Sequence, residues 1–475
     1  MSKQNFTTYQ SPFTWRYGSE EMRHIWSEKN KFKIMRRIWV ELATAQTGLG
    51  LISQEELEDL KKNQNDIDIE RILEIEKETK HDIVAAIKEF AEKAKVGGGK
   101  IHLGATSMDI VDNTDSIRMN ESLTIIETKL KETLKSFASQ ISTYADTPCM
   151  GYTHLQPAEP TTVGYRLSIY AQDFLEDLTL LRFVKSRYRA KGFKGAVGTQ
   201  ASYTSLLDKT QTTDMEKNVM NKLGLDPVLI SNQVGPRKAD LFVAQLLSSI
   251  AQSLNKFAFD VRLMQSAGIG EWQEPFGNKQ VGSSAMPFKR NPRKSEQICS
   301  LARFVENLSK NAWDNASLSL LERTLDDSAN RRAYIPEMFL ALEDILVSSN
   351  NIIDGLIVHK GQVENNLQKF APFSATELII IETVKKGADR QEMHEILREI
   401  SMKAWQEVAD AKPNPMRELL QKNEKITKYL SKEEIEKLLD VRSHVGTAPE
   451  RAKKLVEEIN KVSNNTSLRG THDNA

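Results

Sequence analysis

The sequence predicts an all-α protein built around a bundle of long helices. Apolar residues between 239 and 267 recur at steps of three and four, the stripe of a helix that packs against a core. No strongly alternating run indicates a large sheet. Four stretches contain neither glycine nor proline, which cost about 1 and 3 kcal/mol in a helix interior: 105–147, 165–191, 239–267 and 293–335. Helices of this length bury their apolar stripes only against one another, as a bundle.

The first hundred residues also read as helical, most clearly at 32–48 and 55–61, until three consecutive glycines at 97–99 interrupt the chain. Two glycines bound residues 192–198, where we expect a small hairpin. After Pro336 a shorter helix is expected to run through Ile353.

From residue 360 onward the predicted segments shorten, and the polar tail from Asn464 is expected to fray. The breaks between these segments fall at Pro372, Gly387, Pro413 and Pro415. The chain therefore divides into an N-terminal helical domain (1–106), a central long-helix bundle (107–359) and a C-terminal helical domain with its tail (360–475).

Composition narrows the function classes. Of 475 residues, 39% are apolar and 27% charged, which is typical of a folded globular protein. Lysine plus arginine and aspartate plus glutamate are both 65, so the balance argues against a nucleic-acid partner, and any phosphate site needs a local basic cluster. No stretch is apolar enough to cross a membrane, and the N-terminus lacks an apolar leader. With two cysteines, Cys149 and Cys299, expected as buried thiols rather than a bridge, we predict a cytoplasmic protein.

The segment 277–292 has the composition of a mobile loop over an anionic ligand. Its glycines and prolines exclude helix and strand, and it carries adjacent hydroxyls at Ser283 and Ser284 together with Lys289 and Asn291. These groups offer a base, a cation and an amide, as expected of a lid. A solvated connector is the alternative, since such loops are common at protein surfaces.

Several blocks of this sequence resemble the fumarase/aspartase superfamily and, within it, the adenylosuccinate lyase family of the animal-like branch. They follow the family's order from about residue 11 to residue 440: Ser11-Pro12 with 16–19, 80–82, 102–107 with 112–114, 153–157, 282–292 with Glu296, and 322–332. The resemblance implies three helical domains and a long central bundle that tetramerises. It also implies β-elimination of fumarate from adenylosuccinate, giving AMP, and from the succinyl-aminoimidazole-carboxamide ribotide.

An elimination of this kind needs a base for a weak carbon acid, an acid for the leaving nitrogen, and cations for the developing charge. By resemblance Ser283 is the base, with Ser284 as the alternative, and His154 is the general acid. Lys289 then neutralises a succinyl carboxylate, and Glu296 orients His154. Read without the resemblance, these would be a serine turn, a hydrogen-bonded histidine and a first-turn helix carboxylate.

The remaining matched residues are expected to bind the substrate. Thr106 and Ser107 stand where a long helix begins, a natural anion site, and Arg323, Ser328, Arg331 and Arg332 suit a phosphomonoester. Asp82 could equally cap a helix beginning at Ile83, and the arginines could form a salt-bridged helix face with Asp326 and Asp327. The resemblance gives His81 a catalytic role. It implies substrate contacts for the following residues: Arg16, Tyr17, Lys80, Asp82, Thr106, Ser107, Gln233, Asn291, Arg323, Ser328 and Arg332.

Two further features follow from the blocks. Asp112 and Asn113 are expected to serve the structure. Gln297 departs from the family pattern, which often has arginine there, so a charged contact is absent or comes from elsewhere.

The resemblance implies no metal or organic cofactor, a homotetramer whose active sites combine residues of three subunits, and small phosphorylated substrates. Neither a nucleic acid nor a membrane is an expected partner. Two rival functions remain: another lyase of the superfamily, such as argininosuccinate lyase or aspartase, which has no need of the 322–332 cluster, and a non-enzymatic structural role.

Overall fold

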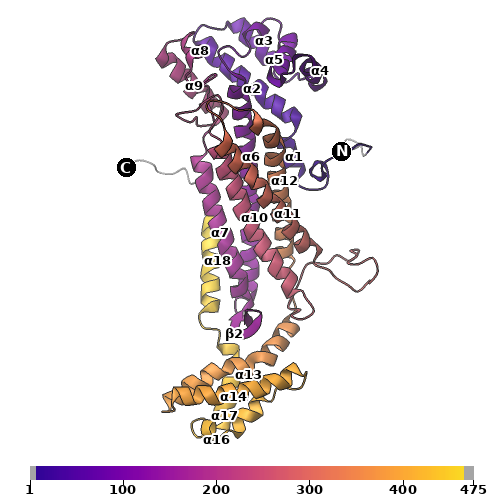
Figure 1. Ribbon diagram of the computed structural model, residues 1–475, viewed down its shortest axis with the longest axis vertical. Helices are drawn as coiled ribbons and strands as arrows, with labels where there is room; N and C mark the ends of the chain where they lie inside the picture. Colours follow the sequence, from indigo (N-terminus) through magenta and orange to yellow (C-terminus); the bar gives the residue numbers. More distant parts are fainter. Residues whose placement is uncertain (1–6, 465–475) are drawn as a thin grey trace. The chain divides into compact units, whose positions relative to one another are not determined.

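The computed structural model describes residues 7–464, which fold as helices with a few short strands (Figure 1). By its contacts the chain separates into two compact units. The first comprises Met1–Leu130, Glu176–Asn255 and Cys299–Val347, and the second Lys131–Leu175, Lys256–Ile298 and Ser348–Ala475. The all-α prediction is confirmed. The three-domain boundaries stay a prediction.

Five long helices have residues in both units: α6 (Ser107–Tyr144), α7 (Val163–Arg187), α10 (Lys238–Met264), α11 (Arg293–Leu318) and α12 (Asp326–Asp354). The first three match the stretches free of glycine and proline to within four residues at each end. In α10, Leu246, Ile250, Leu254, Phe257 and Val261 are all buried, as the apolar stripe predicts.

The remainder of the first unit is a set of shorter helices, most of which pack on one hydrophobic core. Their bounds are η1 (Pro12–Thr14), α1 (Glu20–Ile25), α2 (Glu28–Gly48), α3 (Gln54–Asn63), α4 (Ile69–Thr79), α5 (Asp82–Lys93), η2 (Gly98–Lys100), α8 (Ala201–Thr204) and α9 (Lys209–Leu223). Of these, η1 and α1 contribute no residue to the core. The predicted helices at 32–48 and 55–61 lie within α2 and α3. Capping residues fix several starts, such as the reciprocal Ser53–Glu56 pair at α3. Trp39, Phe90, Tyr203 and Met220 lie in the core of this group, which Figure 1 shows around α2.

In the second unit, α13 (Lys360–Lys385) is the centre of a second core, which includes Met150, Leu367, Leu397, Leu420 and Ile435. Around it are grouped α14 (Arg390–Ala409), α15 (Met416–Lys422), α16 (Glu424–Thr427), α17 (Lys432–Leu439) and η3 (Val441–Ser443). Two antiparallel pairs complete this unit: β1 (Pro148–Thr153) with β2 (Gln156–Thr162), and β3 (Trp272–Gln273) with β4 (Ile357–Val358). The last helix, α18 (Ala448–Asn464), contacts β2.

Two predictions that relied on proline as a helix breaker are wrong. Pro336 lies inside α12, and Pro372 lies inside α13. Around Pro336, Ile335, Met338 and Phe339 are buried. Burial of side chains this large, at about 1.5–3 kcal/mol each, outweighs the proline penalty of about 3 kcal/mol.

Conversely, the predicted helix over 293–335 is interrupted at 319–325, where α11 has ended and α12 has not begun. Leu321 has φ +42°, a left-handed conformation. The carbonyls of Leu321 and Glu322 accept hydrogen bonds from Asn232 Nδ2 and Gln233 N, both at 3.1 Å. A second loop therefore takes the backbone groups that a continuous helix would use.

The expected hairpin at 192–198 is also wrong. The backbone N–H groups of Gly192 and Gly195 donate to the side chains of Asn113 and Asp109, at 3.1 and 3.2 Å, instead of to a partner strand. These bonds confirm the structural role predicted for Asn113.

Both cysteines are buried free thiols, as predicted. The tail is expected to fray from Asn464, which the structure places at the end of α18; the rest of it, 465–475, lies outside the described residues. Within residues 7–464, no helix combines the length and the apolar character that a membrane span requires.

Candidate active site

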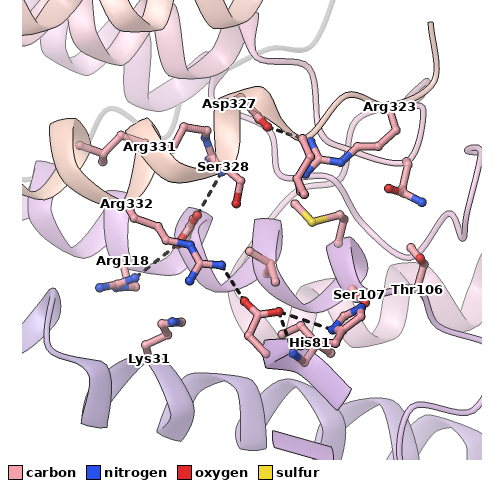
Figure 2. Close-up of a pocket in the computed structure, with 18 of the residues that line it drawn as sticks. Lys31, His81, Thr106, Ser107, Arg118, Arg323, Asp327, Ser328, Arg331 and Arg332 are labelled. Carbon is pink, nitrogen blue, oxygen red and sulfur yellow. Dashed lines mark hydrogen bonds and ion pairs between the residues drawn. The ribbon is translucent and has the colours of Figure 1, made fainter. Parts of the chain in front are cut away.

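The first unit contains a cavity of about 580 Å³ that collects nine of the predicted site residues. They are Lys80, His81, Asp82, Thr106, Ser107, Gln233, Arg323, Ser328 and Arg332. They come from the junction of α4 and α5, the start of α6, the loop before α10, the break at 319–325, and the first turns of α12. Figure 2 shows Arg323, Ser328 and Arg332 on one side of this space and His81, Thr106 and Ser107 on the other.

At the α4–α5 junction, Lys80 adopts a left-handed conformation, φ +54°, which ends α4 and turns the chain into α5. His81 then occupies the N-cap of α5, and its Nδ1 accepts from the Val84 N–H at 3.4 Å. The interpretation of Asp82 as the cap is therefore wrong, since Asp82 is the first residue of the helix. When Nδ1 accepts, the neutral ring carries its proton on Nε2.

The beginning of α6 presents a helix N-terminus to the cavity. Thr106 N donates to Asp109 Oδ2 at 3.0 Å, and α6 begins at Ser107. Asp109 is completely buried and forms an ion pair with Lys191, which is equally buried. The charge of Asp109 is thus matched inside the protein, and the positive end of the helix dipole stays available to an anion.

A chain of ion pairs connects Arg323 to the loop that carries Gln233. Arg323 Nη1 lies 2.9 Å from Asp327 Oδ1, and Arg237 Nε lies 2.6 Å from Asp327 Oδ2. Arg237 continues to Asp112 at 3.1 Å, and Asp112 accepts from the Gly235 N–H at 2.7 Å. Asp112 therefore has the structural role expected for it.

Charge keeps Asp327 ionised in this network. Burial alone would raise the pKa of the Asp327 carboxyl. The nearby guanidinium groups of Arg237 and Arg323 more than offset this effect, so the pKa lies below its usual range.

Arg331, which the sequence placed within the phosphate cluster, lies on the cavity wall as a buried structural residue. Its guanidinium pairs with Asp240 at 2.8 Å and with Asp115 at 3.3 Å. Arg332 is more than half exposed and reaches across the cavity to Asp82. Of these two neighbouring arginines, Arg332 is the one positioned to meet a ligand.

Two cationic residues of the wall, Lys31 and Arg118, were missed by the sequence reasoning. Arg118 lies over the Trp26 ring at 4.4 Å and donates to the Trp26 carbonyl at 2.7 Å. It lies on α6, on the face that carries Ser107, three helical turns away, and this periodicity is a signal that could have found it. Lysines and arginines of the wall outnumber its carboxylates by seven to five, which suits an anionic ligand.

Arg16 and Tyr17 belong to the same unit but are not among the residues that line this cavity. The Arg16 guanidinium lies 5.6 Å from the Trp15 ring centre and 5.8 Å from that of Tyr17. Their contact with a substrate stays a prediction.

His154 lies in the second unit, at the tip of the β1–β2 hairpin. Thr153 pairs with Gln156, so His154 and Leu155 form a two-residue turn. Both have positive φ, +53° and +60°. Turns of this geometry favour Asn-Gly or Gly-Gly, so two side-chain-bearing residues here are held under local strain. His154 is exposed and borders a cavity of about 750 Å³ within the second unit.

The loop 277–292 also belongs to the second unit. Ser283 Oγ accepts from the N–H groups of Ala285 and Met286 at 3.4 and 3.1 Å, forming a serine turn. Asn291 Nδ2 donates to the Gly282 carbonyl at 3.0 Å and so orders the loop. Lys289 is exposed, and Glu296 is exposed in the first turn of α11.

Comparison with known proteins relates this arrangement to a family. Residues 14–306 match the family described as Lyase, and residues 372–455 match the adenylosuccinate lyase C-terminus. Adenylosuccinate lyase from Methanocaldococcus jannaschii is 40% identical, over 96% of both chains. The chain belongs to the adenylosuccinate lyase family. The Schizosaccharomyces pombe member is 37% identical over 96% of this chain and 95% of its own.

Solved structures agree with the fold. A fumarate lyase from Mesorhizobium sp. BNC1 superposes with a TM-score of 0.82 at 24% identity, covering 95% of this chain and 99% of its own. A 3-carboxy-cis,cis-muconate lactonizing enzyme from Pseudomonas putida gives 0.84 at 22% identity, with the same coverage. The fold of this family member is thus that of the fumarase/aspartase superfamily, as the sequence predicts.

Proposed function

We propose that this protein eliminates fumarate from adenylosuccinate, giving AMP, and from the succinyl-aminoimidazole-carboxamide ribotide. The observation that carries the proposal is one cavity in which Arg323, Ser328 and Arg332 face the N-terminus of α6. Guanidinium forks and helix N-termini both favour phosphate and carboxylate oxygens. The identity with adenylosuccinate lyases along 96% of the chain supports this assignment.

In the proposed site the first-unit cavity supplies binding. Arg323, Ser328 and Arg332 hold the phosphate, with Arg16 and Tyr17 completing that pocket. The remaining contacts come from Lys80, Asp82, Thr106, Ser107 and Gln233. His81 takes part in catalysis through Nε2, the ring nitrogen that its capping bond leaves available.

The proposed chemistry belongs to residues of the second unit. Ser283 removes the proton from carbon, and Lys289 neutralises the carboxylate that gathers negative charge. His154 protonates the leaving nitrogen, oriented by Glu296, while Asn291 keeps the loop ordered. The hydroxyl of Ser283 becomes a competent base only after its proton is lost, which N–H groups and Lys289 would favour in the closed loop. The proposed reaction uses no cofactor.

We further propose a homotetramer in which three subunits contribute to each site. The binding residues line a cavity of the first unit, whereas the proposed base and acid belong to the second and are absent from its wall. Sites completed by neighbouring copies would reunite these groups. A cytoplasmic location and the animal-like branch stay predictions.

Ultraviolet spectroscopy tests the reaction. Adenylosuccinate, argininosuccinate and aspartate are supplied separately, and the absorbance of each mixture is followed. We expect turnover of adenylosuccinate alone, because argininosuccinate and aspartate leave the phosphate cluster unused. Turnover of either control without adenylosuccinate would refute the proposal in favour of another superfamily lyase, and turnover of none would favour a non-enzymatic role.

A further inference from the structure

The side chain of Gln265, the residue that follows α10, joins the two ends of the loop that carries Ser283. Gln265 Oε1 accepts from the Glu274 N–H at 2.9 Å, at the start of the loop. Its Nε2 donates to the Arg290 carbonyl, also at 2.9 Å, at the end of the loop. One amide therefore uses both its acceptor and its donor to hold together the two chain segments at the base of the loop, around Glu274 and Arg290, which we call the neck.

Glu274 secures the same neck on its other side. Its carboxylate is buried and accepts from the backbone N–H groups of Lys294 and Ser295, at 3.2 and 2.6 Å, in the first turn of α11. The backbone of Glu274 is thus held by Gln265 and its side chain by α11. Arg290 also contacts the segment that leads into the loop, with its guanidinium 5.2 Å from the Phe276 ring centre.

Beyond the neck, a second closure fixes the position of Ser283. Gly282 and Lys289 approach so closely that a Cβ on Gly282 would lie 2.0 Å from the Lys289 carbonyl oxygen. Asn291 Nδ2 bonds the Gly282 carbonyl on the same side. Ser283 is therefore the first residue of the loop's tip, which begins where Gly282 and Lys289 approach each other. The direction of the Ser283 side chain depends on how the two segments of the neck are aligned.

We propose that Gln265 is a positioning residue that sets the register of this loop and thereby the placement of Ser283. The inference rests on the proposed role of Ser283 as the base, and it assigns to Gln265 no contact with the substrate. Without the two hydrogen bonds of the Gln265 amide, which we call the clasp, the segments at Glu274 and Arg290 separate. The loop then samples more conformations in which Ser283 is misplaced. The consequence falls on the chemical step, because the phosphate-binding residues do not belong to the loop.

Two substitutions separate the two bonds. Gln265→Met keeps the side-chain volume and loses both. Gln265→Glu keeps the acceptor for the Glu274 N–H and loses the donor to Arg290. The matched control is Gln252→Met, at an exposed glutamine of α10.

Hydrogen–deuterium exchange of the peptides covering 274–292 is measured beside kcat and KM for adenylosuccinate. In Gln265→Met we expect faster exchange across the loop and at the Glu274 amide, whereas Gln265→Glu keeps the Glu274 amide protected. Each lost bond should lower kcat about threefold to tenfold, with KM changing less. The control should match the wild type in both measurements.

Unchanged exchange in Gln265→Met would overturn the clasp, and faster exchange with unchanged kcat would overturn its role in positioning Ser283. Failure of the proposed function itself looks different, since the wild-type protein would then fail to turn over adenylosuccinate.

Discussion

Arg332 and Asp82, 250 residues apart in the sequence, meet across the cavity with 2.6 Å between Nη2 and Oδ2. Burial would raise the pKa of Asp82, but the Arg332 hydrogen bond and charge lower it below its usual range. Asp82 accepts one of the five N–H donors of a guanidinium, so it can hold Arg332 in place while other donors face a ligand. The two residues that the sequence assigned separately to substrate binding thus act on each other.

Asp82→Asn tests this relationship. We expect KM for adenylosuccinate to rise about threefold to tenfold, because Arg332 is more than half exposed and a neutral amide holds it weakly. Steady-state kinetics at constant ionic strength measures the change. A lower KM would mean that Asp82 competes with the ligand for Arg332 instead of presenting it.

Arg323→Gln tests whether the cluster at the start of α12 reads the phosphate. A charge-assisted hydrogen bond contributes about 1.5–3 kcal/mol, so kcat/KM for adenylosuccinate should fall about tenfold to a hundredfold. Succinyladenosine, which lacks the phosphate, should show little difference between the variant and the wild type. Arg390→Gln, at an exposed arginine that opens α14, serves as the control. An equal loss on both substrates would contradict a phosphate contact.

The long helices could be predicted because their sequence pattern is local. Glycine and proline are disfavoured in helix interiors, so the stretches that lack them marked α6, α7 and α10 closely. The break at 319–325 and the helix that continues through Pro336 could not be predicted in this way. The first depends on bonds donated by Asn232 and Gln233, the second on buried neighbours.

Site residues could be predicted where they fall in the sequence blocks that resemble the family. Residues of the cavity wall outside those blocks could not be predicted in this way. Thr106, Ser107 and Arg323 were found, and all line the cavity. Lys31 and Arg118 belong to none of the quoted blocks. Lys31 lies on α2 and Arg118 on α6. The helical period places Arg118 on the face of Ser107, but no local pattern shows that α2 and α6 line one cavity, since that depends on tertiary packing. The hairpin that presents His154 was missed because its turn residues, His-Leu, are unlike those such turns favour.

Ser283→Ala and His154→Ala should each remove nearly all turnover while the assembly persists, since both side chains are accessible and support no core. Turnover of adenylosuccinate and the mass of the assembly in solution are the two measurements. Mixing the inactive variants and allowing subunits to exchange should restore part of the activity if sites are shared between copies. Full activity in either single variant would contradict its role, and no recovery after verified exchange would contradict sharing.

Leu155→Gly should stabilise the protein by about 0.5–1 kcal/mol. Leu155 has φ +60° and a side chain that is 67% exposed, so glycine relieves a left-handed conformation at little loss of burial. The midpoint of denaturant unfolding measures the change. Leu229→Gly, at a leucine that is 90% exposed and outside the residues with positive φ, should not be stabilising. Equal effects of the two substitutions would show that the turn stores no strain.

His102 gives the protein a stability that depends on pH. Burial lowers the pKa of its imidazole from 6.5 to about 4, and the Trp39 indole N–H donates to Nδ1 at 3.1 Å, which requires that nitrogen to be unprotonated. At a pH between these two pKa values, His102 is protonated in the unfolded chain and neutral in the folded chain. The free energy of unfolding therefore rises with pH through this window and falls as pH drops from 6.5 toward 4. Its slope against pH corresponds to a difference of up to about one bound proton between the unfolded and folded states.

His102→Asn should flatten that slope, measured by urea unfolding between about pH 4.5 and pH 7.5, the window that the linkage relation sets. Asparagine tolerates the left-handed conformation at this position, φ +70°, and its carbonyl oxygen can still accept from Trp39. The loss of titration is thus separated from the loss of the hydrogen bond. His359→Gln, at an exposed histidine, should keep the wild-type slope. An unchanged slope in His102→Asn would mean that other groups carry the acid sensitivity.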